Sequence, residues 1–371
     1  MDVLMTALQP GGGIKTFFRY IYGNEVFDHC TFTLFAPDHG LSEYLDNSLG
    51  ESRIRVINSP ERSHLFVKEL RKVLGKRRYD LVHSHGFGAG LLTELSMTGL
   101  KQQHLMTAHD VFQASQFGGV AGSVKKIFMA LLFKRMNAIH TVTNDATDNF
   151  HSFFPSVPER CLHPILHGVD TDYFSSGSGV DLRADLELEA DLPLVGFFGR
   201  FMGQKGFRTL VDAIEQLKLT GFGRLPKVLT FGWGGYIRED YQYLEAKGLS
   251  EQFIQMPGTD NMPAMIKAVD MVVMPSRWEA CGLLAMEVLS AGVPLLSTDC
   301  IGLREVVAGS PTRIFSPGSA EGLAAAIKAE IADPSRDRFL DYQPIAVERF
   351  HIGRPAAELR ALYDELVGQT L

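Results

Sequence analysis

The sequence predicts an α/β protein with two domains, each built on a parallel sheet that helices cover on both faces. The chain has 371 residues, more than one domain usually contains, so two domains are expected. Short runs of Val, Ile, Leu and Phe alternate with longer helical patterns along the chain. Runs that are apolar at successive positions are typical of strands buried on both faces of a parallel sheet.

The expected elements form two successive sets. Strands are expected at 3–7, 31–35, 54–57, 81–84, 104–108 and 139–142 in the first set, and at 194–198, 228–231, 271–274 and 295–297 in the second. Helices are expected at 15–21, 61–74, 91–97, 207–217, 282–291 and 320–331, and near 356–366.

The stretch 175–193 is rich in Ser and Gly and then acidic, which is typical of a linker or a long surface loop. We expect a first domain at 1–172 and a second at 173–345. A C-terminal helix is expected within 346–371, crossing back to the first domain.

Composition excludes several classes of protein. The net charge of −7 argues against a general nucleic-acid binder, which would carry a basic excess. The four cysteines are widely spaced and form no CxxC pair, as expected for reduced thiols in a cytoplasmic protein. No signal peptide is recognised at the N-terminus, and no run of 18 apolar residues predicts a membrane span.

Two glutamates flank the start of an expected helix near residue 282. Glu287 falls inside this helix, and Glu279 falls at or just before its N-terminus. The backbone N–H groups of Gly282, Leu283 and Leu284 would then be free to hold an anion such as a phosphate. The alternative is that the acid only complements the helix dipole.

Two cations follow the expected strand 194–198. Arg200 and Lys205 lie on a strand-to-helix loop that also carries Gly199, Gly203 and Gly206. An arginine fork and a mobile lysine suit a diphosphate, and glycines let the backbone approach a ligand closely. The alternative is a solvated loop with incidental charges.

Other motifs carry weaker signals. His83 and His85 could be a metal-binding pair, but they lack a third ligand, and a strand end without a role is the simpler interpretation. The glycines of 86–90 do not match the spacing of a dinucleotide-binding loop. We find no acidic motif or His/Cys cluster that predicts a metal site. The stretch 123–136 has basic ends and an apolar middle, which fits a helix at a membrane surface or a core helix with charged ends.

The motifs resemble, in order, those of the retaining GT-B glycosyltransferases of family 4. The pattern GR-x4-KG at 199–206 is followed by PSR-x-E-x7-E at 275–287. LHGVDTDYF at 166–174 is similar to the family's interdomain stretch, with His167 in place of the usual Asn. The glycine loop at 8–17 and the segments at 79–86 and 106–110 also resemble the family. Ala280 and Cys281 stand where the family usually has Gly and Phe, so the identity of the donor sugar is not inferred from the resemblance.

The resemblance implies two Rossmann-like domains facing a central cleft, and catalytic roles for Glu279, His109, Arg200 and Lys205. Arg200 and Lys205 would neutralise the diphosphate, and Glu279 would face the donor sugar. Glu287 would accept hydrogen bonds from the ribose.

The first domain would contribute a loop and a histidine. Gly12 and Gly13, with Gly11 beside them, would let this loop reach the diphosphate. His109 would contact the donor sugar or the acceptor.

The implied activity is transfer of a hexose, with retention, from a UDP-sugar or GDP-sugar to a glycan, a lipid-linked acceptor or a small molecule. The nucleotide sugar is then a co-substrate, and neither a metal nor another cofactor is expected. A GT-B epimerase or hydrolase and an inactive sugar-nucleotide-binding protein are the alternatives. The resemblance also favours peripheral contact with the cytoplasmic face of a membrane through residues 123–136.

Overall fold

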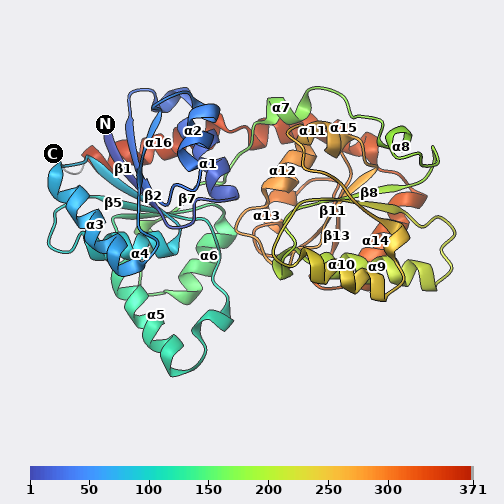
Figure 1. Ribbon diagram of the computed structural model, residues 1–371, viewed down its shortest axis with the longest axis horizontal. Coiled ribbons are helices and arrows are strands. Elements are labelled where there is room, and N and C mark those ends of the chain that lie inside the picture. The colour runs from blue at the N-terminus through green and yellow to red at the C-terminus, as the bar shows by residue number, and fades with distance from the viewer. Residues whose placement is uncertain (369–371) are drawn as a thin grey trace. The chain divides into compact units, whose positions relative to one another are not determined.

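The computed structural model describes residues 1–368 and divides the chain into two compact units. The first unit contains Met1–His167 together with the chain from Ile352 onward, and the second contains Gly168–His351 (Figure 1). The stretch 175–193 therefore lies inside the second unit. Residues 369–371, part of the expected C-terminal region, lie outside the described residues.

The first unit is built on a seven-stranded, all-parallel sheet in the order β3-β2-β1-β4-β5-β6-β7. Its strands are β1 (Asp2–Ala7), β2 (Thr31–Ala36), β3 (Ile54–Asn58), β4 (Leu81–His85), β5 (His104–Ala108), β6 (Ala138–Thr141) and β7 (Leu162–Pro164). Its helices are α1 (Gly13–Tyr22), η1 (Glu25–Phe27), α2 (Leu41–Leu49), α3 (Ser63–Lys76), α4 (Phe87–Ser96), η2 (Ala114–Phe117), α5 (Gly119–Phe133), α6 (Asn144–Phe153), η3 (Glu159–Cys161) and α16 (Gly353–Gly368).

Successive residues of β1 supply opposite faces of this sheet. Val3 and Met5 belong to the apolar core that includes residues of α1, α2 and α16. Leu4 points the other way and belongs to the core that includes Phe66 and Leu70 of α3. Because both faces are covered, β1 is buried throughout its apolar run, as expected for a parallel strand.

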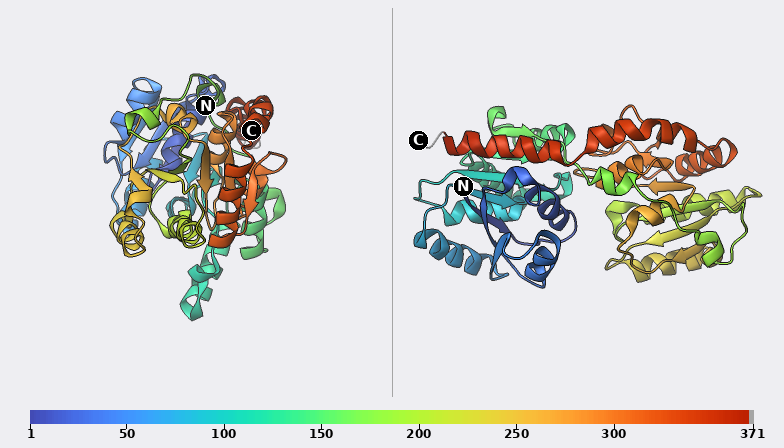
Figure 2. Two further views of the ribbon diagram at one scale, coloured as in Figure 1. Left: turned by 90° about the vertical axis from the view of Figure 1, so that its right-hand side faces the viewer. Right: turned by 90° about the horizontal axis from the view of Figure 1, so that it is seen from above.

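The C-terminal helix α16 completes the core of the first unit. It packs against α1, η1 and β4, although it lies far from them in the sequence (Figure 2). Leu359, Leu362 and Tyr363 are buried in the same core as Phe18 and Ile21 of α1. The first unit is therefore assembled from both ends of the chain.

The second unit repeats the design with a six-stranded parallel sheet in the order β10-β9-β8-β11-β12-β13. Its strands are β8 (Leu194–Phe198), β9 (Lys227–Phe231), β10 (Phe253–Gln255), β11 (Met271–Met274), β12 (Leu295–Thr298) and β13 (Arg313–Phe315). Its helices are α7 (Thr171–Ser175), α8 (Leu182–Asp185), η4 (Gly203–Lys205), α9 (Phe207–Leu219), α10 (Ile237–Ala246), η5 (Ser250–Gln252), α11 (Met262–Lys267), α12 (Leu283–Ser290), α13 (Arg304–Val307), α14 (Ala320–Ala332) and α15 (Arg336–Phe350).

The predicted two-set α/β organisation is confirmed, and each strand expected from the sequence is present. The apolar runs of the sequence do not predict β7, β10 and β13, each of three residues. Such strands are too short to show a period, and all three lie at sheet edges and are only partly buried. Only the pairing with a neighbouring strand defines them.

Truncation of the buried Leu359 should loosen the first unit. Leu359→Ala removes a fully buried side chain and should cost about 2–5 kcal/mol, whereas Glu358→Ala on the exposed face should cost less than about 0.5 kcal/mol. Hydrogen-exchange mass spectrometry should show faster exchange of β1 and β4 in Leu359→Ala but not in Glu358→Ala. Equal exchange of β1 in the two variants would contradict the role assigned to α16.

Candidate functional site

The predicted site residues of the second unit follow two adjacent strands. Arg200 comes directly after β8, and Glu279 comes shortly after β11. These strands are neighbours in the sheet, and the strand order reverses between them. In open parallel sheets, ligands bind in the crevice outside the carboxyl ends of the strands at such a reversal.

Glu279 is a buried carboxylate held by three side-chain contacts. Its Oε1 atom lies 2.7 Å from Nζ of Lys205 and accepts a hydrogen bond of 2.7 Å from Oγ of Ser276. Its Oε2 atom lies 3.5 Å from Nε2 of Gln204. Its own N–H donates to the carbonyl of Ile301 at 3.0 Å. A buried charge needs such partners, so the loop holds Glu279 in one position.

Lys205 and Glu279 come together because the loops after β8 and β11 are fastened to each other. The side chain of Gln204 donates to the carbonyl of Trp278 at 2.9 Å, and the N–H of Arg277 donates to the carbonyl of Gln204 at 2.8 Å. Gly206 ends the first loop with φ of +71°, and a Cβ there would overlap the carbonyl oxygen of Pro275. Glycine is therefore required at this close approach.

Gln204 and Ser276 are site residues that the sequence reasoning missed. Both lie inside the motifs already singled out, beside Lys205 and three residues before Glu279. Their polarity was the available signal, but neither residue type predicts which carboxylate it will contact. The sequence also does not predict the pairing of Lys205 with Glu279, since the resemblance assigns Lys205 to the diphosphate and Glu279 to the donor sugar.

Arg200 differs from Lys205 in being exposed. Within residues 1–368, its guanidinium has no hydrogen bond or ion pair. Gly199 beside it makes a backbone hydrogen bond from its N–H to the carbonyl of Phe231 at 2.9 Å. The backbone at the end of β8 is thus fixed, while the arginine fork remains available to an anion.

Glu287 lies inside α12, as predicted, and it is partly buried. Desolvation raises its pKa to about 7, although the positive charge of Lys205 acts in the opposite direction. A carboxyl with this pKa changes its charge near neutral pH. It can accept two hydrogen bonds at each oxygen only when deprotonated.

The expectation of three free N–H groups at the start of α12 is wrong for two of them. The N–H of Gly282 donates to the carbonyl of Gly302 at 3.2 Å, and that of Leu283 donates to the carbonyl of Cys281 at 3.0 Å. The turn before α12 folds back on the loop after β12 and satisfies these donors internally. Among the described hydrogen bonds, the N–H of Leu284 alone of the three has no acceptor.

The glycine loop of the first unit lies between β1 and α1. Gly12 is exposed, caps α1 with φ of +54°, and has no side chain that could satisfy the helix N-terminus. A Cβ at Gly11 or Gly13 would meet no atom of the described residues within 4 Å. The loop leaves open space at the start of α1, where the N–H of Ile14 already donates to the carbonyl of Gly11 at 3.3 Å, and the space suits an anion at the helix N-terminus.

His109 lies at the carboxyl end of β5 and is partly exposed. Its Nε2 atom lies 3.0 Å from Nδ1 of His85, and the ring of Phe17 packs edge-on against it at 4.9 Å. Desolvation holds the pKa of His109 well below its usual value, with His140 and His167 contributing in the same direction. His109 is therefore a neutral imidazole at pH 7.

The predicted site residues thus form two groups, each at the carboxyl edge of its own sheet. Gly12, Gly13 and His109 belong to the first unit, and the remaining residues belong to the second. Across residues 1–368, no three His, Cys, Asp or Glu side chains are grouped in a way that could hold a metal ion.

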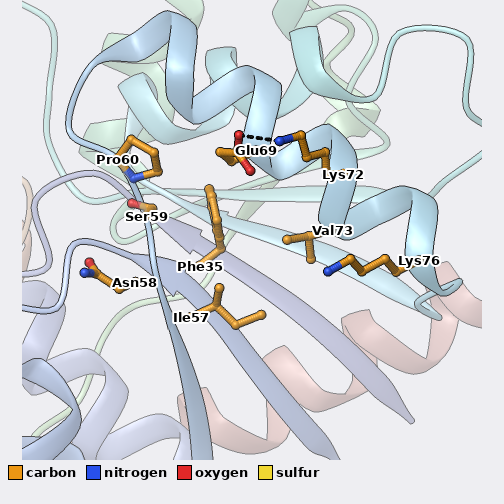
Figure 3. Close-up of a pocket in the computed structure, with 9 residues that line it drawn as sticks. All are labelled: Phe35, Ile57, Asn58, Ser59, Pro60, Glu69, Lys72, Val73 and Lys76. Carbon is orange, nitrogen blue, oxygen red and sulfur yellow. Dashed lines mark hydrogen bonds and ion pairs between the residues drawn. The ribbon is translucent and has the colours of Figure 1, made fainter.

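A separate hollow of about 470 Å³ lies between the edge of the first sheet and α3 (Figure 3). Residues of β2, β3 and α3 line it, among them Phe35, Ile57 and Lys76. An ion pair of 2.7 Å joins Lys72 and Glu69 at its rim. None of the predicted site residues lines this hollow.

Comparison with known families covers both units. Residues 13–173 match the family described as Glycosyltransferase Family 4, and residues 192–333 match the description Glycosyl transferases group 1. The chain belongs to the family 4 glycosyltransferases. Its two Rossmann-like units are those of the GT-B fold.

Relatives within this family differ in their substrates. The α-maltose-1-phosphate synthase of Mycolicibacterium smegmatis is 25% identical over 70% of this chain and 71% of its own. The lipopolysaccharide core mannosyltransferase LpsB of Rhizobium meliloti is 27% identical over 64% of this chain and 68% of its own.

Solved structures share the fold at low identity. Sucrose-phosphate synthase of Thermosynechococcus elongatus matches with a TM-score of 0.83, 19% identity and full coverage of both chains. HepE of Anabaena in complex with UDP matches with a TM-score of 0.82 and 19% identity, covering 98% of this chain and 100% of that one.

Loss of the two cations should affect the stability of this glycosyltransferase differently. Lys205→Met leaves the buried Glu279 without its counter-ion and should cost about 1–3 kcal/mol, whereas Arg200→Met should change stability by less than about 0.5 kcal/mol. Trp233 and Trp278 are the chain's two tryptophans and both lie in the second unit, so their fluorescence during urea unfolding reports on this unit.

The double variant Lys205→Met/Glu279→Gln supplies the control. It should recover part of the stability that Lys205→Met loses, because no uncompensated charge remains. Additive losses from the two substitutions would show that the ion pair does not hold the loop.

Proposed function

We propose that this enzyme transfers a hexose from a UDP-sugar or GDP-sugar to a hydroxyl group of a glycan, a glycolipid or a small molecule. The reaction retains the anomeric configuration and needs no metal ion. The nucleotide sugar is a co-substrate, and no other cofactor takes part.

The arrangement of Arg200, Lys205 and Glu279 carries this proposal. An exposed guanidinium and a lysine lie in the loop after β8, and the lysine contacts a carboxylate that is 6% exposed. Cations at this edge stabilise the charge that develops on a leaving diphosphate, which is usually the largest contribution to catalysis. A carboxylate beside them suits the positive charge that develops on the sugar.

Known relatives support a nucleotide sugar as the donor and a glycan or a lipid-linked molecule as the acceptor. HepE of Anabaena has been solved with UDP and with UDP-glucose. The named products of other relatives include a sugar phosphate and the core of a lipopolysaccharide. We infer a nucleotide sugar as the donor and a glycan or a lipid-linked acceptor for this chain.

The residues have distinct roles in the proposed reaction. Arg200 and Lys205 stabilise the departing diphosphate, and in the first unit the loop at Gly12 and Gly13 offers backbone N–H groups to a phosphate of the donor. Glu279 faces the donor sugar, and the acceptor attacks from the side that the diphosphate leaves. The leaving phosphate takes the proton of the acceptor hydroxyl, so no separate base is needed. His109 contacts the sugar or the acceptor as a neutral imidazole.

A panel of donors tests the function directly. Thermal shifts with UDP, GDP, ADP and their sugars should single out one base, since a ligand at 100 times its Kd stabilises a protein by about 2.7 kcal/mol. Sugar transfer should then require an acceptor, give a product of unchanged anomeric configuration by NMR, and continue in EDTA.

Each other outcome rejects part of the proposal. Release of free sugar or an isomerised donor without an acceptor would indicate a hydrolase or an epimerase, and binding without turnover would indicate an inactive binding protein. Activity that EDTA abolishes and Mg²⁺ or Mn²⁺ restores would contradict the metal-independent mechanism.

The two glutamates should separate binding from catalysis. Glu287→Gln weakens contacts with the ribose that change little during the reaction, so it should raise the donor KM more than it lowers kcat. Glu279→Gln should mainly lower kcat and leave nucleotide affinity nearly unchanged. Steady-state kinetics and calorimetric binding of the free nucleotide measure both effects.

The pH dependence of donor binding is a second test of the role proposed for Glu287. Because its pKa is about 7, its carboxylate forms as the pH rises through neutrality, and the donor should bind more tightly at pH 8 than at pH 6. Glu287→Gln should flatten this dependence, while Glu279→Gln should keep it. Loss of nucleotide binding in Glu279→Gln alone would reverse the two assignments.

We also propose that α5 contacts the cytoplasmic face of a membrane. One side of this helix is buried in the first unit through Met129, Leu132 and Phe133, as in the core interpretation. The other side exposes an apolar stripe, with Val120 at 83% and Ile127 at 64% exposure; the remaining members are Val124, Phe128 and Leu131. Lys125 and Lys134 flank the stripe and are exposed, an arrangement typical of helices that lie in an anionic interface.

One further observation supports a cytoplasmic location. All four cysteines are free, as expected in a reducing cytoplasm. No helix within residues 1–368 is long and apolar enough to cross a bilayer.

Vesicle binding tests the α5 surface. Binding to phosphatidylglycerol vesicles should weaken with salt, and Lys125→Glu/Lys126→Glu should reduce it by at least about tenfold, since each basic residue near the surface contributes about 1 kcal/mol. Ile127→Ser should reduce binding at constant charge. Leu219 is an exposed leucine of the second unit, outside the α5 stripe. Leu219→Ser is therefore the control, and it should bind vesicles as the wild type does. The proposal falls if the wild type does not sediment with these vesicles at low salt.

A further inference from the structure

A continuous chain of hydrogen bonds connects His109 with the interior of the first sheet. His109 contacts His85, His85 contacts Tyr22 of α1 at 3.0 Å, and Tyr22 lies 3.2 Å from Tyr363 of α16. Tyr363 contacts Nδ1 of His83 on β4 at 2.5 Å. The proposed function uses only the first of these residues.

The chain continues from His83 to a backbone carbonyl. Nε2 of His83 lies 2.7 Å from the hydroxyl of Thr107, which lies 3.0 Å from Nδ1 of His140. Nε2 of His140 lies 3.2 Å from the carbonyl oxygen of Ile165. This oxygen can only accept, so it fixes the direction of the bonds that lead to it.

The histidines of the chain are neutral. Desolvation lowers the pKa of His83, His85 and His109 well below the usual value and that of His140 to about 4. Each ring therefore carries one N–H and one lone pair, and the nitrogen that donates is determined by the partner of the other.

The direction follows from the carbonyl outward. His140 donates from Nε2 to Ile165, so its Nδ1 accepts the hydroxyl proton of Thr107. Thr107 then accepts from Nε2 of His83, and Nδ1 of His83 is left as an acceptor. Tyr363 is the nearer of the two tyrosines to this nitrogen, at 2.5 Å against 3.0 Å for Tyr22, so Tyr363 donates to it.

The remaining contacts are all satisfied by one arrangement. Tyr22 donates to the oxygen of Tyr363, and His85 donates from Nε2 to the oxygen of Tyr22. Nδ1 of His85 then carries a lone pair, which accepts a hydrogen bond from the Nε2–H group of His109. If His85 were protonated at Nδ1 instead, its Nε2 would have to accept the hydrogen bond that Tyr22 donates. The contact between the two tyrosine oxygens would then have no hydrogen atom to bridge it.

We propose that Tyr22 and His85 are positioning residues that hold His109 in its Nε2–H form, so that its Nδ1 atom presents a lone pair to a sugar hydroxyl. Within residues 1–368, Nδ1 of His109 has no hydrogen-bond partner, and the side chain is partly exposed. A lone pair accepts a hydroxyl proton and repels a phosphate oxygen. His109 then recognises a hydroxyl of the donor sugar or the acceptor, and this role rests on the proposed function.

Packing against phenylalanine rings holds the imidazole rings of His85 and His109 in this orientation. Phe18 packs edge-on against His85 at 4.7 Å, and Phe17 packs edge-on against His109 at 4.9 Å. These contacts oppose the ring flips that would exchange the two nitrogens. The tautomer is therefore controlled by hydrogen bonding, while the orientation is controlled by packing.

NMR of the ¹³C,¹⁵N-histidine-labelled protein tests the tautomer without reference to activity. The His109 signals, assigned with His109→Gln, should show at least about a tenfold excess of the Nε2–H form, because reversal leaves a hydrogen bond unmade. Tyr22→Phe removes the acceptor of His85 and should move these signals toward the Nδ1–H form. A wild-type spectrum of the Nδ1–H form would overturn the inference at once, whether or not Tyr22→Phe folds.

Tyr363→Phe is the matched control, since it removes an equally buried hydroxyl from the same cluster. Tyr22 can then donate to Nδ1 of His83 at 3.0 Å and still accept from His85, so the His109 signals should stay unchanged. Equal shifts in Tyr22→Phe and Tyr363→Phe would indicate general loosening and contradict the assigned direction.

Kinetics link the tautomer to the reaction. Tyr22→Phe should lower kcat by about tenfold, the equivalent of one hydrogen bond, without changing nucleotide affinity. Tyr363→Phe should keep kcat. Normal turnover in a Tyr22→Phe enzyme whose tautomer has changed would overturn the role of His109 toward a hydroxyl. Absence of sugar transfer by the wild type would reject the proposed function, while the NMR result would still decide the tautomer.

Discussion

Every strand of both sheets runs parallel to its neighbours, and this constraint decides where the chemistry lies. Each parallel pair needs a crossover helix, so the loops that leave the strands all emerge at one edge of the sheet. Arg200 and Glu279 follow β8 and β11, and Gly12 and His109 follow β1 and β5. Both sheets reverse their strand order at the centre, which opens this edge between neighbouring loops.

The two units solve the problem of buried polar groups at this edge in different ways. The second unit buries a full negative charge at Glu279 and matches it with Lys205, Ser276 and Gln204. At the carboxyl edge of the first sheet, neutral histidines and tyrosines are joined to one another by hydrogen bonds. A charged pair suits a reaction in which charge separates, and a neutral network suits recognition of hydroxyl groups.

The first unit depends on the end of the chain. Tyr363 of α16 contacts both Tyr22 and His83, so the helix that returns from the second unit takes part in both the polar network and the apolar core. Any change that detaches α16 exposes the core of the first unit and the network that leads to His109. The stability of this unit and the chemistry at its edge therefore share one support.

The sequence by itself determined the two α/β domains and the placement of Arg200, Glu279 and Glu287 on their elements, because long apolar runs and local glycine signals are properties of contiguous residues. Only the tertiary structure decided which residues these side chains and backbone groups contact. The ion pair of Lys205 with Glu279 joins loops from different strands, and the N–H of Gly282 is satisfied by a loop further along the chain. Such contacts arise from strand order in the sheet, which no local pattern encodes.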